Sequence, residues 1–68
     1  MLNPFIDYLI RKKAIVNLKT SISFRGIVWY TTGRYIIMRN AELLGDNPKQ
    51  LDGEVVVERK EVEFIQVI

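Results

Sequence analysis

Cysteine and histidine are both absent from this chain of 68 residues. Their absence excludes disulfide bonds, zinc sites of the usual ligand type, and nucleophilic catalysis based on cysteine or histidine. A core of this size supplies on its own no more than about 3–5 kcal/mol, so natural domains this small usually add disulfides, a metal or oligomerisation. Oligomerisation is the support that remains, and a hydrophobic fraction of 49% fits a further buried surface between subunits.

Long apolar runs are missing as well, and none is long enough to cross a bilayer. Asn3, Pro4 and Asp7 precede the first basic residues, the reverse of a secretory signal, so we expect a cytoplasmic protein without a membrane partner. The net charge of +2 is far from the dense positive field of a duplex-binding domain, but it is compatible with nucleic acid held at a local site.

The acidic residues show no spacing typical of a metal site or an acid–base pair. The glycines stand in isolated positions rather than in a phosphate-binding loop. We therefore expect no enzymatic activity, no cofactor and no metal.

A short helix is predicted over residues 3–12. Asn3 suits the N-cap and Pro4 the first helical position, and apolar residues at helical spacing form one stripe. Lys12 and Lys13 at its end are either a solvated helix terminus or a patch that contacts phosphate.

The residues that follow read as strands with turn signals between them, at about 14–19, 21–31, 34–43, 54–59 and 62–67. The densest turn signals fall in residues 43–53, which we expect to be a connecting loop. This order predicts a mainly β fold in a single domain over residues 1–68, with the helix followed by a five-stranded, strongly bent antiparallel sheet or small open barrel over residues 14–68.

The second strand carries the strongest local signal. Ile22, Phe24, Val28 and Tyr30 are expected to share one face, with Gly26 among them in mid-strand. An interior strand glycine indicates a sharp bend or a close approach of another backbone. The tight turn that follows, Thr32–Arg34, contains a glycine able to adopt positive φ.

Two stretches of sequence carry a family pattern. In AIVNLKTSISFRGIVWYTTGRYIIMRNAEL, an alternating strand precedes Phe24 and Gly26, and a later strand ends in Asn40 and Ala41. In EVVVERKEVEFIQVI, an apolar strand ends in Arg59. These features resemble the first and second motifs of the Sm-like family, over residues 4–68. The resemblance implies a ring of identical subunits, six or seven by family precedent, that binds single-stranded RNA as a scaffold or chaperone.

The resemblance also implies where RNA would bind. In Sm-like rings, the turn between the second and third strands lies beside the turn between the fourth and fifth strands, at the central pore. The first turn then offers Arg34 and Tyr35, and the second offers Arg59 and Lys60. Aromatic and guanidinium planes both stack on bases, at about 1–3 kcal/mol per aromatic contact.

Subunit contacts follow from the same resemblance, because the fourth strand of one subunit pairs with the fifth strand of the next. The apolar residues of these strands, Val55, Val57, Phe64 and Ile65, are therefore the candidate interface.

The sequence also departs from the family pattern. RNA-binding members usually carry an aspartate before the first turn and an asparagine after it, whereas this chain has Thr31, Thr32 and Tyr35 in that region. Lys60 replaces the glycine after the motif arginine. These departures leave an alternative function, a structural or protein-assembly ring that binds no RNA. Tyr35 either stacks on bases or only packs, and Arg59 either contacts RNA or pairs with a neighbouring glutamate.

Three further side chains are expected to be structural. Trp29, on the face opposite Phe24, is expected to pack against the helix or at an interface, with a platform for a ligand as the alternative. Arg25 and Arg39 are expected to be charges on the strand surface, with RNA contact as the alternative.

Overall fold

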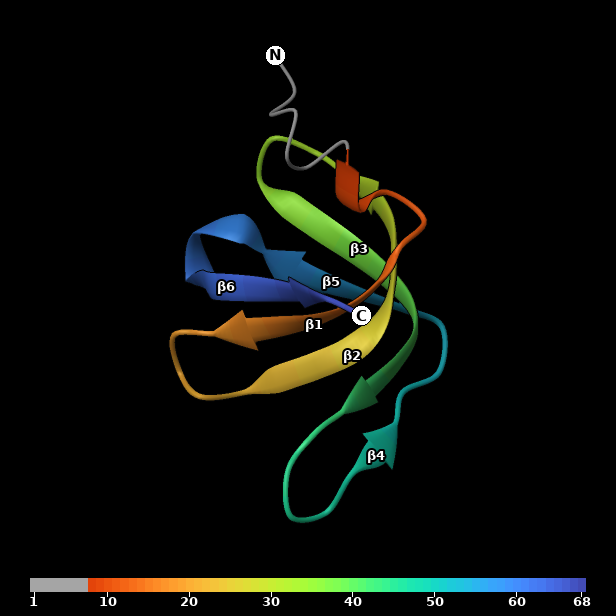
Figure 1. Cartoon of the computed structure of the whole chain (residues 1–68), viewed down its shortest axis with the longest axis vertical. Coiled ribbons are helices and arrows are strands. Elements are labelled where there is room, and N and C mark those ends of the chain that lie inside the picture. The colour runs from red at the N-terminus through yellow and green to blue at the C-terminus, as the bar shows by residue number, and fades with distance from the viewer. Residues whose placement is uncertain (1–7) are drawn as a thin grey trace.

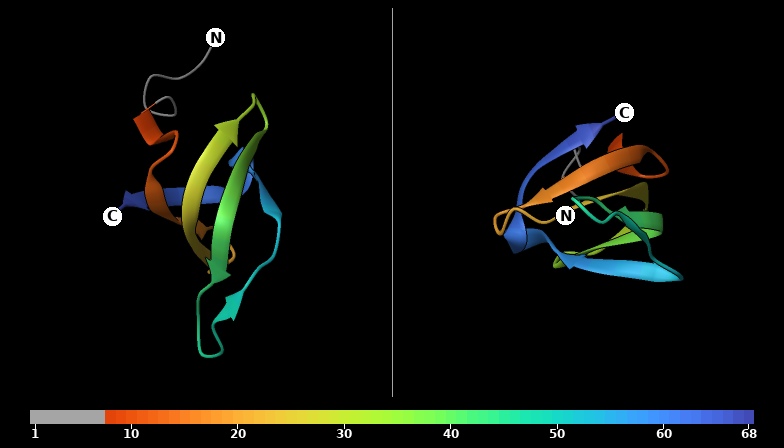
Figure 2. Two further views of the ribbon diagram at one scale, coloured as in Figure 1. Left: turned by 90° about the vertical axis from the view of Figure 1, so that its right-hand side faces the viewer. Right: turned by 90° about the horizontal axis from the view of Figure 1, so that it is seen from below.

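The computed structural model describes residues 8–68, and its main feature is one strongly bent antiparallel sheet (Figure 1). The strands run in the order β4-β3-β2-β1-β6, and β5 pairs with β3 as well. Figure 2 shows the β2–β3 pair curving across the molecule, with β1 and β6 on one side and β5 on the other. The predicted mainly β fold is confirmed. The strands are β1 (Lys13–Leu18), β2 (Ser23–Thr31), β3 (Tyr35–Leu43), β4 (Lys49–Gln50), β5 (Glu54–Glu58) and β6 (Val62–Val67), with the 3₁₀ turn η1 (Arg59–Glu61) between the last two.

Two predicted segments, the loop over residues 43–53 and the helix over residues 3–12, need comment. Residues 43–53 are not only a loop, because they include β4, which pairs with the end of β3. Of the predicted helix over 3–12, residues 3–7 lie outside the described residues. Tyr8 and Leu9 are helical, and the chain then turns into β1. No helix in residues 8–68 combines the length and the apolar character needed to cross a membrane.

The core lies on the inner face of the bent sheet. Successive strand side chains point to opposite faces, so each strand contributes alternate residues. In β1, for example, Ala14 and Val16 are fully buried while Lys13 is exposed. The fully or almost fully buried apolar residues are Leu9, Ala14, Val16, Val28, Ile36, Met38, Ala41 and Val57.

A bulge opposite Gly26 bends the β2–β3 pair. Between the Arg25 and Ile27 pairs, two residues of β3, Asn40 and Ala41, face Gly26 alone. Asn40 has a φ of 53°, in the left-handed region that asparagine tolerates better than most residues. A Cβ on Gly26 would lie 2.9 Å from Ala41 Cα. The predicted close backbone approach at Gly26 is confirmed.

A second bulge lies in β2 itself, where Trp29 is the extra residue between the Val28 and Tyr30 pairs. An extra residue shifts the in–out alternation by one position. The predicted common face is wrong at both ends, and the bulge accounts for the end at Tyr30. Val28 is buried, but Tyr30 is 59% exposed, and Ile22 lies before the strand and is exposed.

Candidate nucleic-acid interface

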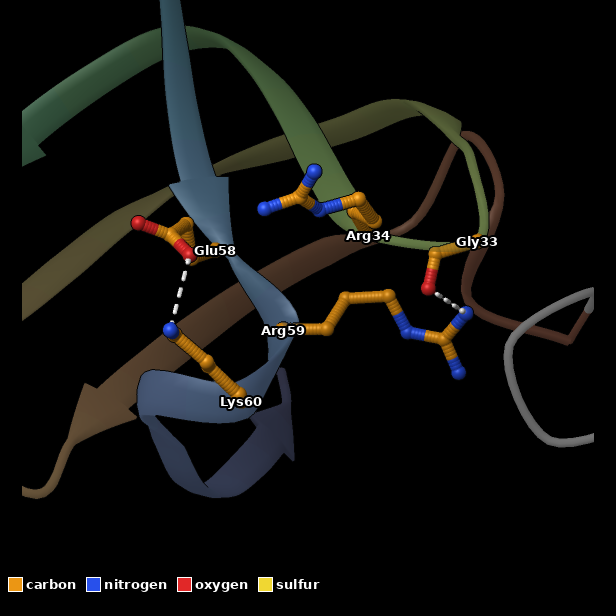
Figure 3. A pocket seen from close by; sticks show the side chains of 5 residues that line it. All are labelled: Gly33, Arg34, Glu58, Arg59 and Lys60. Carbon is orange, nitrogen blue, oxygen red and sulfur yellow. Dashed lines mark hydrogen bonds and ion pairs between the residues drawn. The ribbon is translucent and has the colours of Figure 1, made fainter.

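A pocket of about 140 Å³ lies where the β2–β3 turn meets η1 (Figure 3). Gly33 and Arg34 line it from the turn, Glu58 from the end of β5, and Arg59 and Lys60 from η1. Three of the four residues predicted to contact RNA therefore line one pocket, although the two segments are far apart in the sequence. The fourth, Tyr35, is not a lining residue but pairs across the strands with Glu58, which is one.

The β2–β3 turn is closed by a threonine side chain. Thr32 Oγ1 accepts hydrogen bonds from the backbone N–H groups of Arg34 (3.2 Å) and Tyr35 (2.9 Å), and the Thr32 N–H donates to the Tyr35 carbonyl (2.9 Å). This is the local hydroxyl-to-backbone bonding that favours threonine in turns. Gly33 does not take positive φ, although a glycine is able to. The turn needs no left-handed residue because the hydroxyl satisfies its N–H groups.

Arg59 holds the two turns together. Its Nη1 donates to the carbonyl oxygens of Thr32 (3.0 Å) and Gly33 (3.3 Å), and its backbone N–H donates to the Arg34 carbonyl (2.8 Å). Of the two sequence-based readings of Arg59, pairing with a glutamate does not occur among the described residues. The glutamate contact belongs to Lys60 instead, whose Nζ lies 3.6 Å from Glu58 Oε2.

Arg34, which lines the pocket, forms a cation–π pair with Tyr35. Arg34 Cζ lies 5.6 Å from the centroid of the Tyr35 ring, within cation–π range. Tyr35 is part-buried and pairs across the strands with Glu58, whereas Arg34 is exposed. The Lys60 side chain is 72% exposed. Two exposed cations and one part-buried aromatic ring therefore surround the hydrogen-bonded guanidinium group of Arg59, an arrangement suited to phosphate and base contacts.

Glu58 is the pocket residue that the sequence did not assign to the site. Its carboxylate lowers the positive charge at the pocket and holds Lys60 in an exposed ion pair. The position of Glu58 directly before the motif arginine was a partial indication that it belongs to the site. Only the strand pairing places it opposite Tyr35. Among residues 8–68, no group of three acidic side chains could hold a metal ion.

The predicted interface residues point in different directions. Val57 is buried in the core, and Val55 and Ile65 pack against it, whereas Phe64 is 52% exposed. Val56, which the sequence analysis passed over, is 59% exposed. The pairing of β5 with β3 decides which of its three consecutive valines are buried, and the sequence of the valines alone could not show this. A role for these residues between subunits stays a prediction.

No protein-family model and no curated protein matches the sequence. Solved structures do match. A heptameric archaeal Sm protein superposes with a TM-score of 0.84 at 26% identity, over 97% of this chain and 98% of the other. The P. aerophilum SmAP1 heptamer gives 0.82 at 27% identity, over 94% and 88%. The Pyrococcus abyssii Sm protein in complex with a uridine heptamer gives 0.82 at 24% identity, over 98% and 100%.

Proposed function

We propose that this chain, whose fold is that of the Sm-like proteins, assembles with its own copies into a closed ring and binds single-stranded RNA as a scaffold or chaperone. The observation that carries the proposal is the pocket itself. Arg34, Arg59 and Lys60 come together there from two distant turns, next to the Tyr35 ring. The Pyrococcus abyssii protein with its uridine heptamer supports RNA as the ligand.

The strand edges support assembly. Within residues 8–68, β5 pairs only with β3 and β6 only with β1, so in this part of the chain each strand keeps one free edge. Unpaired edges are templates for another chain. On β6, the Ile68 N–H donates to the Lys13 carbonyl. Because N–H groups alternate sides along a strand, the N–H of Ile65 points to the free edge.

The same reasoning applies to β5. The Arg59 N–H donates to the carbonyl of Arg34, the residue directly before β3, so the N–H of Val56 points to the free edge of β5. Pairing β5 of one subunit with β6 of the next is a heterologous contact, which yields a ring where the rotation closes. The exposed side chains of Val56 and Phe64 lie on these two strands and give the contact an apolar component. The two heptameric Sm structures support seven subunits, within the expected range of six or seven.

The pocket chemistry sets the expected mode of RNA binding. Arg34 and Lys60 bind phosphate, so affinity falls as salt rises. Tyr35 offers only a ring face, which every base can use. Thr32 and Tyr35 stand in the region where family members carry an aspartate and an asparagine, so discrimination among bases is weak. Repetition around a ring multiplies a weak site by avidity.

Fluorescence anisotropy with labelled oligo-U and oligo-A at two salt concentrations tests this function. Lys60→Ala is expected to weaken both complexes by a similar factor and to flatten the salt dependence. Lys49→Ala, which removes an exposed lysine of β4 outside the pocket, is the matched control and is expected to leave binding unchanged. Arg59→Ala is also expected to weaken binding and flatten the salt dependence. It is a less specific test, because it removes the hydrogen bonds from Arg59 to the carbonyl groups of the β2–β3 turn as well.

Two results would argue against the proposal. A parent protein that binds neither RNA at micromolar concentration favours the alternative, an assembly ring without an RNA role. Strong preference for oligo-U would mean that base-reading groups lie outside this pocket.

A further inference from the structure

The link between β4 and β5 is a bulge rather than a free loop. Both strands pair antiparallel with β3, so they form one interrupted strand along it (Figure 1). The register of β3 against β4 differs by one residue from its register against β5, and the link supplies the extra residue. The Leu51 N–H donates to the Ala41 carbonyl (2.8 Å). Asp52 and Gly53 are left opposite Asn40 alone, and Gly53 takes a φ of 72°.

The two residues of this bulge have no partner in the described part of the chain. Both Asp52 and Gly53 are exposed, and a Cβ on Gly53 would meet no atom within 4 Å. Among residues 8–68, the Gly53 N–H donates to no oxygen atom. In the same range, the Asp52 carboxylate lies within 4.0 Å of no basic side chain. The Gly53 nitrogen and the Asp52 carboxyl group are therefore free to react with each other.

The order of these two residues favours that reaction. An amide nitrogen that attacks the carboxyl group of an aspartate directly before it closes a five-membered ring. A side chain on the attacking residue hinders the approach, and glycine has none. Gly53 is the only glycine of the chain that follows an aspartate or an asparagine. Asp46 is exposed too, but Asn47 follows it, so it serves as an internal comparison.

We propose that the Asp52–Gly53 bond is a modification site, at which the folded protein spontaneously forms a succinimide and then isoaspartate. The Gly53 nitrogen loses its proton and bonds to Asp52 Cγ, while a Cγ–O bond breaks and its oxygen leaves as water. Water then adds to one of the two ring carbonyl groups. Addition at Cγ restores aspartate, and addition at the main-chain carbonyl carbon gives isoaspartate, whose backbone runs through Cβ and Cγ. The atoms balance without an enzyme or a cofactor, and the site requires neither the ring nor RNA.

Isoaspartate lengthens the main chain by one carbon atom directly before β5. Glu54, the first residue of β5, pairs with Arg39, and its Oε2 lies 3.0 Å from Arg39 Nε. The longer link changes the spacing between this pair and the hydrogen bond from Leu51 to Ala41. We therefore expect the start of β5 to pair less firmly with β3 and the Tm of the modified protein to fall by a few degrees.

Incubation of the full-length protein in ¹⁸O-labelled water at neutral pH tests the proposal. The isomerisation itself changes no mass, but the hydrolysis step introduces one ¹⁸O atom whichever carbonyl group reacts. Trypsin, used afterwards in ordinary water, releases Asp52 and Asp46 in separate peptides, residues 50–59 and 40–49. We expect label to accumulate over weeks in peptide 50–59 several-fold faster than in peptide 40–49. Chromatography is expected to resolve an isoaspartyl form of peptide 50–59.

Two variants are the controls. Asp52→Glu keeps the charge but would need a six-membered ring, so it is expected to take up no label and to show no fall in Tm with time. Gly53→Asn keeps a residue that tolerates positive φ and adds a side chain beside the attacking nitrogen. It is expected to take up label several-fold more slowly than the parent. Melting curves of fresh protein check that both variants fold.

A synthetic peptide of residues 50–59 gives the rate without the fold. The folded protein is expected to react within several-fold of this rate, because the bulge leaves the bond unpaired. A folded protein that takes up no label at Asp52 while the peptide does would refute the proposal, as would equal labelling of Asp46 and Asp52. Equal labelling of Gly53→Asn and the parent refutes the role of the glycine. If the labelled parent and Asp52→Glu keep the same Tm, the effect on β5 is refuted. None of these results bears on RNA binding, which anisotropy measures separately.

Discussion

Gly26→Ala adds a single methyl group at the tightest point of the sheet. The new Cβ would lie 2.9 Å from Ala41 Cα, 3.0 Å from the Arg39 carbonyl oxygen and 3.2 Å from the Asn40 carbonyl oxygen. All three are backbone atoms, which cannot rotate away as a side chain does. The bulge has to open, and overpacking of this kind costs about 1–3 kcal/mol of the free energy of unfolding. For a domain of this size, each kcal/mol shifts Tm by roughly 4–8 °C. The expected fall in Tm is therefore of the order of 5–20 °C, and larger for Gly26→Val.

Gly33→Ala is the matched control, because no atom lies within 4 Å of its added Cβ and its φ is not positive. It is expected to leave Tm unchanged or to raise stability by up to about 1 kcal/mol, through the lower entropy of the unfolded chain. Thermal unfolding is followed by circular dichroism at one fixed protomer concentration, since assembly makes Tm depend on concentration. If the Gly26→Ala protein has the same Tm as the parent, the close approach of the two backbones at the bulge is refuted.

Three further predictions concern binding and assembly. Glu58→Gln is expected to strengthen RNA binding a few-fold at low salt, because it removes the carboxylate that lines the pocket. Glu63→Gln, at an exposed position of β6, is the control and is expected to leave binding unchanged. If Glu58→Gln leaves the affinity measured by anisotropy unchanged or lowers it, Glu58 does not lie where RNA binds. Ile65→Pro deletes an N–H on the free edge of β6 and is expected to give folded monomers, as measured by light scattering and circular dichroism. Phe64→Pro deletes an N–H that faces β1 and is expected to unfold the chain. A ring that still forms with Ile65→Pro would contradict the proposed pairing between subunits. Tyr35→Ala is expected to weaken oligo-U and oligo-A binding by a similar factor in anisotropy, and a loss confined to one base would contradict stacking without base selection.

Much of the fold was predictable because alternation and turn residues act locally. The strands follow apolar alternation, and Gly26 marks the bend because only glycine leaves room for a second backbone. The bulges were not predictable from the pattern. Trp29 is an ordinary strand residue in the sequence, and only the pairing of its neighbours with β3 makes it the extra one. That single insertion takes Tyr30 off the face that it was expected to share with Val28 and leaves it exposed.

The candidate site was predictable only through the family resemblance. Nothing in the spacing of Arg34 and Lys60 brings their two turns together, and the resemblance implied that they meet. The roles within the pocket needed the structure. The side chain of Arg59 leaves η1 toward the carbonyl groups of the turn rather than toward a glutamate, and Glu58 enters the pocket from the strand end. These directions depend on how β3 pairs with β5, which no local sequence signal encodes.

Assembly of the parent protein is the most direct test of the account, because the avidity that strengthens a weak RNA site depends on the ring. Multi-angle light scattering of the purified chain at micromolar concentration measures it. For a subunit of 8.0 kDa, six or seven copies give a mass of about 48 or 56 kDa. A mass of 8.0 kDa, that of the monomer, would contradict the account.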